Sequence, residues 1–171
     1  FLCLSKGLTG GYLPLSVVLT TNKIYDSFYD SYVSLKAFLH SHSYTGNPLA
    51  CSAALATLKI FREDNVISNN KKLVSHITRN GKRFEDHPNI GHIRQTGMIF
   101  AVEMVSDKKG KVPFPWQQRR GLRAYQYALK NNVLLRPLGN VLYFMPPYVI
   151  TSEEIDIVFE VMEGAVDAAV S

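Results

Sequence analysis

The sequence predicts an α/β fold in its front part and an α+β unit behind it. Three observations support this prediction. Residues 1–20 hold two short apolar runs separated by glycines, which is typical of buried strands. From residue 66 on, segments with helical spacing alternate with groups of strands. A polar break, Arg62-Glu63-Asp64-Asn65, stands between the two parts. We therefore expect one domain over residues 1–63 and a second over residues 64–171.

Composition indicates an ordinary globular protein, since 46% of the 171 residues are hydrophobic and 19% are charged. The net charge of +5 is modest, and the basic residues are spread out without interleaved aromatic residues. We therefore expect no nucleic-acid partner. No signal peptide and no apolar run of bilayer length occurs, so we expect no membrane association.

The two cysteines, Cys3 and Cys51, lie in apolar surroundings without the spacing of a metal site. This pattern predicts buried thiols, no metal and a reduced, cytoplasmic compartment. The chain begins with Phe1 rather than Met, and a strand is predicted at once. We therefore expect it to be the C-terminal piece of a longer protein.

The front part is organised around a glycine-rich turn, SKGLTGG at residues 5–11. Residues 1–4 are predicted as a buried strand that leads into it, and residues 13–20 as a second buried strand. A short helix over residues 22–29 can be capped by Thr20 or Thr21. Residues 30–46 lack periodicity and are predicted as a long ordered loop, of the kind that is often functional.

Asn47 and Pro48 predict the start of an Ala-rich helix to residue 61, because Asn is a good N-cap and Pro suits the first helical position. Residues 66–85 are predicted as the next helix. Residues 90–105 are predicted as one long strand or a bent pair broken at Gly97. A helix over 117–130, strands over 133–135 and 141–144, and a last helix from Thr151 to about residue 169 complete the chain.

Lys6 lies at the start of the glycine-rich turn. A partly desolvated lysine there can be an amine nucleophile that forms a Schiff base with an aldehyde cofactor. The alternative is an ordinary solvated lysine beside a turn.

A second candidate site is HSHSYTGNP at residues 40–48, which leads into the predicted helix. Its hydroxyls and free N–H groups suit an anion such as a phosphate. Alternatively, Ser43, Thr45 and Asn47 only cap the helix. His40 and His42 have no acidic partner nearby, so packing is favoured over a metal site.

A third candidate is Arg136, which follows three apolar residues and precedes a proline. Its planar guanidinium matches a substrate carboxylate, although a structural ion pair with Asp or Glu is the alternative. Tyr143 can reach the same space across the predicted corner, unless it only packs.

Three stretches resemble class III aminotransferases of the ornithine type (subgroup II): SKGLTGG at 5–11, HSHSYTGNPLA at 40–50 and LRPLGNVLYFMPPY at 135–148. The likeness covers essentially the whole chain and is greatest to the members that work in biotin biosynthesis. It implies a fold type I pyridoxal-phosphate transferase. Residues 1–63 would be the end of the large cofactor-binding domain, and residues 64–171 the small α+β domain.

The resemblance also implies residue roles. Lys6 would bind pyridoxal 5'-phosphate covalently and move the proton during amino transfer. Ser43, with the backbone of His42, would hold the cofactor phosphate across a homodimer interface. Ser41 would line the substrate pocket, Arg136 would bind the carboxylate of the keto-amino acid, and Tyr143 would lie near the amino-donor pocket.

The implied reaction is a two-stage amino transfer onto 8-amino-7-oxononanoate, which gives 7,8-diaminononanoate. The donor would be S-adenosylmethionine or lysine. The family's phosphate loop, ring-stacking aromatic residue and ring-pairing aspartate are absent from these 171 residues, so we expect the piece alone to be inactive. Alternatives are a class III enzyme for ornithine, acetylornithine or 4-aminobutyrate, or a non-catalytic ligand-binding domain.

Overall fold

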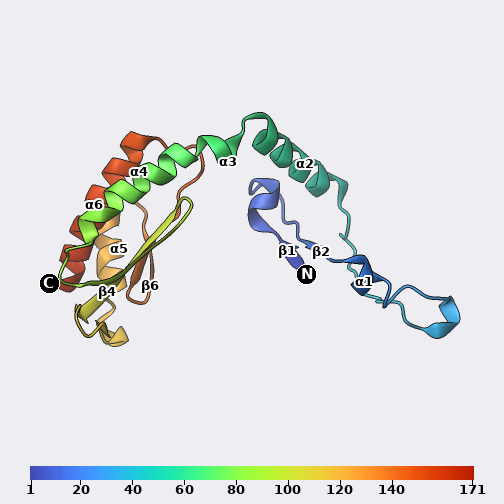
Figure 1. Ribbon diagram of the computed structural model, residues 1–171, viewed down its shortest axis with the longest axis horizontal. Coiled ribbons are helices and arrows are strands. Elements are labelled where there is room, and N and C mark those ends of the chain that lie inside the picture. Colours follow the sequence, from blue (N-terminus) through green and yellow to red (C-terminus); the bar gives the residue numbers. More distant parts are fainter. The chain divides into compact units, whose positions relative to one another are not determined.

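The structure is a computed structural model that describes all 171 residues. The chain divides into two compact units, Phe1–Val66 and Ile67–Ser171, which are described separately (Figure 1). That the first unit is the end of a larger domain stays a prediction.

Unit 1 contains a small antiparallel ladder, one long helix and a long connection between them. Its elements are β1 (Leu2–Leu4), the 3-10 helix η1 (Lys6–Thr9), β2 (Val17–Leu19), α1 (Asn22–Tyr25), the 3-10 helix η2 (Tyr32–Ser34) and α2 (Pro48–Glu63). In the ladder, Leu2 pairs with Leu19 and Leu4 with Val17. The helix predicted over residues 22–29 is thus a single turn, and the Thr21 side chain accepts no capping hydrogen bond from its backbone.

Three residues of unit 1 are buried: Thr9 in η1, and Ala50 and Ala54 in α2. The prediction of buried strands is wrong for this chain, since every residue of β1 is exposed. The prediction of buried thiols is wrong as well, because Cys3 is exposed and Cys51 is half-buried. The physical reason is shared: a two-stranded ladder has no second layer within the chain to cover its faces.

Helix α2 begins as the sequence predicts. The side-chain Oδ1 of Asn47 accepts hydrogen bonds from the backbone N–H of Leu49 at 2.9 Å and of Ala50 at 3.2 Å. Pro48 occupies the first helical position, where its missing N–H leaves no bond unmade. Ala50, Ala54 and Thr57 lie on one face at helical spacing, and this small-residue face packs against η1 (Figure 1).

Unit 2 is a layer of helices on one side of an antiparallel sheet. Its helical elements are α3 (Val66–Asn69), α4 (Lys71–Gly81), η3 (Lys82–Phe84), η4 (Trp116–Gln118), α5 (Arg120–Lys130) and α6 (Ser152–Val170). Its strands are β3 (Ile90–Thr96), β4 (Ile99–Asp107), β5 (Val112–Pro113), β6 (Arg136–Leu138) and β7 (Val141–Phe144). The strand order is β3-β4-β7-β6, with β5 paired to β4.

The two faces of this sheet differ because side chains alternate along each strand. Phe100, Val102, Leu142 and Phe144 point to the core face, where the helices cover them. Aromatic rings form its centre: the Phe100 and Phe159 centroids are 4.9 Å apart. The other face bears the residues between them, which are half-buried or exposed.

Helices α4 and α6 run side by side in unit 2 (Figure 1), and polar pairs bind residues 76–87 to α6. His76 Nε2 lies 2.6 Å from Asp156 Oδ1. Further along, Arg83 pairs with Glu163 at 3.3 Å. None of the chain's helices combines the length and apolar character needed to cross a membrane.

Candidate active site

Lys6 is the first residue of η1 and has a φ of 51°, in the left-handed region that non-glycine residues seldom occupy. Such a conformation costs free energy and persists only where the surrounding structure enforces it. The turn around it is well bonded: Leu8 N–H donates to the Ser5 carbonyl and Gly10 N–H to the Gly7 carbonyl. The glycine-rich turn therefore presents Lys6 in a fixed, strained backbone geometry.

The side chain of Lys6 is exposed, and its amine takes part in no hydrogen bond or ion pair. The expected partial desolvation is therefore not found in this chain, because nothing in unit 1 covers this side of η1. A primary amine without a partner on a rigid turn is nonetheless able to attack an aldehyde carbon.

The second half of the turn is seated on α2. Gly10 has a φ of 62°, and a Cβ added there would lie 3.3 Å from Thr57 Oγ1. Glycine at this position therefore permits both the left-handed backbone and the close approach of turn and helix. Thr57 lies ten residues after the cap Asn47, which is about 15 Å along a helix axis. The Gly10 end of the turn thus lies well along α2 from its N-terminus.

Residues 42–47 form a second tight turn, just before α2. The backbone N–H of His42 donates to Thr45 Oγ1 at 3.1 Å, and Thr45 N–H donates to the His42 carbonyl at 3.0 Å. The His42 ring also accepts, at Nδ1, from the N–H of Tyr44. His42 and Thr45 are therefore occupied in holding the turn, while Asn47 caps the helix.

Ser43 differs from these neighbours. Its hydroxyl and its backbone N–H have no partner, and the N–H of Gly46 is also free. Ser41 is exposed and likewise makes no hydrogen bond. Helix capping thus explains Asn47, and closure of the turn explains Thr45. Ser43 keeps two donors directed to no protein atom, which is the donor set that a phosphate requires.

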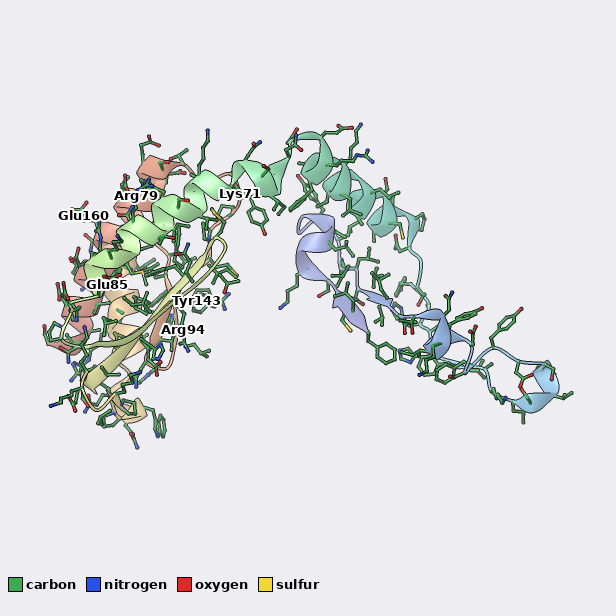
Figure 2. All side chains as sticks on the ribbon, in the orientation of Figure 1. Lys71, Arg79, Glu85, Arg94, Tyr143 and Glu160 are labelled. Atoms are coloured by element: carbon green, nitrogen blue, oxygen red, sulfur yellow. The ribbon has the colours of Figure 1, made fainter.

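In unit 2, Arg136 and Tyr143 face each other directly across the β6–β7 ladder. Directly paired residues of an antiparallel ladder place their side chains on the same face. Ala101 of β4 and Arg94 of β3 continue this row across the sheet. Figure 2 labels Tyr143 and Arg94, which both lie on the sheet. The row belongs to the face that the helices leave uncovered.

The guanidinium of Arg136 has no ion pair or hydrogen bond within the chain, so the structural ion pair considered as an alternative is not formed. Arg136 and Tyr143 line a cavity of about 430 Å³. Arg136 is the one charged residue of its lining, and the other residues are mostly apolar: Asn132, Val133, Leu134, Leu135, Phe144, Met145, Pro146, Pro147, Ile150 and Val158. One guanidinium beside an apolar cavity suits a molecule with a carboxylate and a hydrocarbon chain.

No group of three or more His, Cys, Asp or Glu side chains is placed to hold a metal ion. The ring of His40 stacks on Phe38 at 5.5 Å between centroids. One residue that the sequence does not single out is Thr9, which is buried within the lysine turn. Its position before the two glycines is a weak signal, because only the fold reveals that its side chain is enclosed.

Comparison with known proteins gives consistent likenesses. Residues 1–166 match the family model of class-III aminotransferases. The adenosylmethionine-8-amino-7-oxononanoate aminotransferase of Helicobacter pylori is 49% identical over 159 residues, which cover 91% of this chain and 35% of that protein. The protein of the same name from Geobacter sulfurreducens is 41% identical over 96% of this chain and 36% of its own length. The chain thus spans about a third of the length of these curated relatives.

Solved structures agree. The crystal structure of adenosylmethionine-8-amino-7-oxononanoate aminotransferase from Methanocaldococcus jannaschii superposes with a TM-score of 0.92 at 39% identity, over 96% of this chain and 38% of that one. An (S)-enantioselective omega-transaminase from Thermomicrobium roseum gives a TM-score of 0.88 at 27% identity, over 99% of this chain and 37% of that one.

Proposed function

Because this chain belongs to the class-III aminotransferase family, we propose that the protein transfers an amino group onto 8-amino-7-oxononanoate, using pyridoxal 5'-phosphate, to form 7,8-diaminononanoate in biotin biosynthesis. The α/β fold of the fold type I transferases, expected from the sequence, is confirmed by the solved transaminases that superpose on the chain. The observation that supports the proposed chemistry most directly is Lys6, an amine without a partner on a rigid, strained turn.

The residues fit the cofactor in two respects. Lys6 offers an amine free to bind an aldehyde covalently, and Ser43 offers a free hydroxyl and a free N–H to a phosphate. Pyridoxal phosphate, when bound, supplies the aldehyde carbon and the electron-withdrawing ring that amino transfer requires. In this proposal Lys6 attaches the cofactor and then moves a proton as general base and acid. His42 shapes the turn that presents Ser43, and Ser41 lines the substrate pocket beside it.

We propose a homodimer in which Ser43 of one subunit serves the cofactor held by Lys6 of the other. The packing within unit 1 supports this arrangement. The lysine turn meets α2 at Thr57, whereas Ser43 precedes the start of that helix. The exposure of apolar side chains such as Tyr32 (92%) and Leu39 (94%) also supports burial against further protein surface.

We propose that Arg136 binds the carboxylate of 8-amino-7-oxononanoate. Its guanidinium has no acidic partner, and the cavity beside it has apolar walls that suit a hydrocarbon chain. Tyr143, directly across the ladder, would border the amino-donor pocket. S-adenosylmethionine is the donor we propose, since the similar enzymes from Helicobacter pylori and Geobacter sulfurreducens are named for adenosylmethionine. A biosynthetic enzyme of this kind is proposed to work in the cytoplasm.

The test is reduction with borohydride of the protein expressed from its complete gene, followed by mass spectrometry of the peptides. The cofactor mass should be found on Lys6. The Lys6→Ala variant should lose this adduct and the amino-transfer activity. Lys23→Ala, which removes another exposed lysine of unit 1, should change neither. A cofactor adduct on another lysine, with Lys6→Ala still active, would refute the proposal.

Substrate identity needs a separate test. A strain that lacks its own 8-amino-7-oxononanoate aminotransferase should grow on this precursor when it expresses the gene. Growth failure, together with turnover of ornithine, acetylornithine or 4-aminobutyrate by the purified protein, would favour the other class III activities. Absence of any half-reaction with an amino donor would favour a non-catalytic ligand-binding protein.

A further inference from the structure

Thr9 is the polar residue most completely enclosed in the chain, with an exposed fraction of 1%. In unit 1 only Ala50 and Ala54 share this burial, and both belong to the face of α2 that packs against η1. A buried hydroxyl costs free energy unless it is hydrogen-bonded. The presence of threonine at this buried position therefore needs an explanation, because a small apolar residue would fill the contact between η1 and α2 equally well.

The hydrogen bonds of Thr9 give that explanation. Its Oγ1 donates to the carbonyl oxygen of Leu13 at 2.5 Å, and its own carbonyl accepts from the N–H of Tyr12 at 3.3 Å. The two bonds span Gly10 and Gly11, whose φ angles are 62° and 85°. Thr9 thus closes the glycine turn from one side while its side chain is enclosed in unit 1.

Lys6 lies at the other end of the same four-residue 3-10 helix, in its left-handed conformation. Glycine is the most flexible residue of a chain, so the adjacent Gly10-Gly11 pair would let η1 shift unless a bond held it. We infer that Thr9 is a positioning residue for Lys6: its hydroxyl bond to Leu13 locks the glycine turn and so fixes the backbone from which the lysine amine reaches the cofactor.

This inference rests on the proposed function for its catalytic consequence, but its structural part can be tested without cofactor. Thr9→Val keeps the shape of the side chain and removes the hydroxyl, whereas Thr9→Ser keeps the hydroxyl. In the cofactor-free protein, Thr9→Val should speed the hydrogen exchange of the amides of Gly10 and Tyr12 by about tenfold, since a lost hydrogen bond loosens the turn. Thr9→Ser should stay close to the parent protein.

The cofactor-loaded protein supplies the second readout. With Thr9→Val, kcat per borohydride-trapped Lys6 should fall by about tenfold or more, while the KM for 8-amino-7-oxononanoate stays within about twofold. Thr9→Ser should restore kcat. The matched control is Thr78→Val in α4, because Thr78 Oγ1 also donates to a carbonyl four residues away, at 3.0 Å. It should leave both kcat and the exchange of Gly10 unchanged.

Several results would overturn the inference. One is a Thr9→Val protein that exchanges and turns over as the parent does. Another is a Thr9→Ser protein as impaired as Thr9→Val, because a retained hydroxyl would then not be sufficient to hold the turn. If Thr9→Val does not fold, Thr9→Cys takes its place against Thr9→Ser, since the thiol is a weak donor of similar size. A parent that fixes no cofactor on Lys6 would refute the proposed function, while the exchange measurement would still decide the role of Thr9.

Discussion

Arg136 and Arg94 stand at the two ends of one cross-strand row in unit 2, yet only Arg94 has an acidic partner. The row runs from Arg94 through Ala101 and Tyr143 to Arg136. Arg94 Nη2 lies 3.7 Å from Glu103 Oε2, whereas the guanidinium of Arg136 is unpaired beside the apolar cavity. The sheet thus offers two arginines in comparable positions, one neutralised within the chain and one available to a ligand.

From this difference we predict that Arg136→Gln raises the KM for 8-amino-7-oxononanoate by about 10- to 150-fold, the range expected for losing a hydrogen bond to a charged group. kcat should fall less, because the lost contact binds a carboxylate remote from the keto carbon that receives the amino group. Steady-state kinetics with varied keto-amino acid would measure both. Arg94→Gln is the control and should change the KM by less than about twofold. Equal effects of the two variants would contradict the assignment of Arg136.

Ser43 should contribute to cofactor affinity, because its hydroxyl and N–H lack partners while its neighbours are bonded within the turn. Ser43→Ala removes one hydrogen bond to a phosphate, so the dissociation constant for pyridoxal phosphate should rise by about tenfold. A fluorescence titration of the cofactor-free protein would show it. Ser52→Ala, an exposed serine of α2, should leave the affinity unchanged. An unaltered affinity in Ser43→Ala would place the phosphate elsewhere.

The local signals of the sequence predicted helix ends well. Asn47-Pro48 starts α2, and Thr151 with Glu154 forms a reciprocal capping box at α6. In that box Glu154 Oε2 accepts from the Thr151 N–H at 2.8 Å. Such caps are decided by residues adjacent in the chain. The Gly97 break also has a local cause, since its φ of 55° lets β3 and β4 form a hairpin.

Features that depend on distant contacts were predicted less well. The helix expected over residues 66–85 is divided into α3, α4 and η3. The strand expected at 133–135 begins instead at Arg136, where pairing with β7 starts. The exposure of β1 and the burial of Thr9 depend on which surfaces meet in space, and a one-dimensional pattern does not contain that information. Lys6, Ser43 and Arg136 could be proposed from the sequence because each lies beside a local turn or strand end, and their roles stay predictions.

The hairpin that carries Arg136 and Tyr143 lies close against α5 at Gly121, where there is no room for a side chain. A Cβ on Gly121 would overlap the carbonyl oxygen of Gly139 and lie 2.7 Å from Pro137 Cβ. Both are rigid parts of the β6–β7 hairpin, so Gly121→Ala should destabilise the protein by about 1–3 kcal/mol. It should also raise the KM for the keto-amino acid. Thermal unfolding and kinetics would measure the two effects.

Gly164→Ala is the matched control. A Cβ on Gly164 would lie 2.5 Å from the Tyr127 hydroxyl oxygen, which is a comparably short contact. Tyr127 is 36% exposed, and its ring can swing outward, so the cost should stay below that of Gly121→Ala. If the two alanine variants lost the same stability and both left the KM unchanged, Gly121 would not be supporting the hairpin.

The contact between α4 and α6 should make stability fall at acid pH. The pKa of Asp156 lies below its usual value. The main cause is the side-chain amide of Asn80, which donates to Asp156 Oδ1 at 2.7 Å, and the second is the His76 imidazole. A carboxyl group whose pKa is lowered by folding stabilises the protein above its unfolded-state pKa of about 3.9. This contribution is lost as the pH falls through the lower, folded-state value.

We therefore predict that Asp156→Asn lowers the melting temperature at pH 7 but has a smaller effect near pH 3, where the wild-type carboxyl group has begun to take up a proton. Asn80→Ala, which removes the first donor, should lose part of the same pH dependence, because Asp156 then relies on His76 and on the more distant charge of Arg83. Melting temperatures of the three proteins at both pH values would measure this. If Asp156→Asn lowered the melting temperature equally at pH 7 and pH 3, the ionised carboxylate would not be what joins α6 to α4. Side-chain shape could not explain such a result either, because asparagine has the same shape and would then cause no loss of melting temperature at either pH.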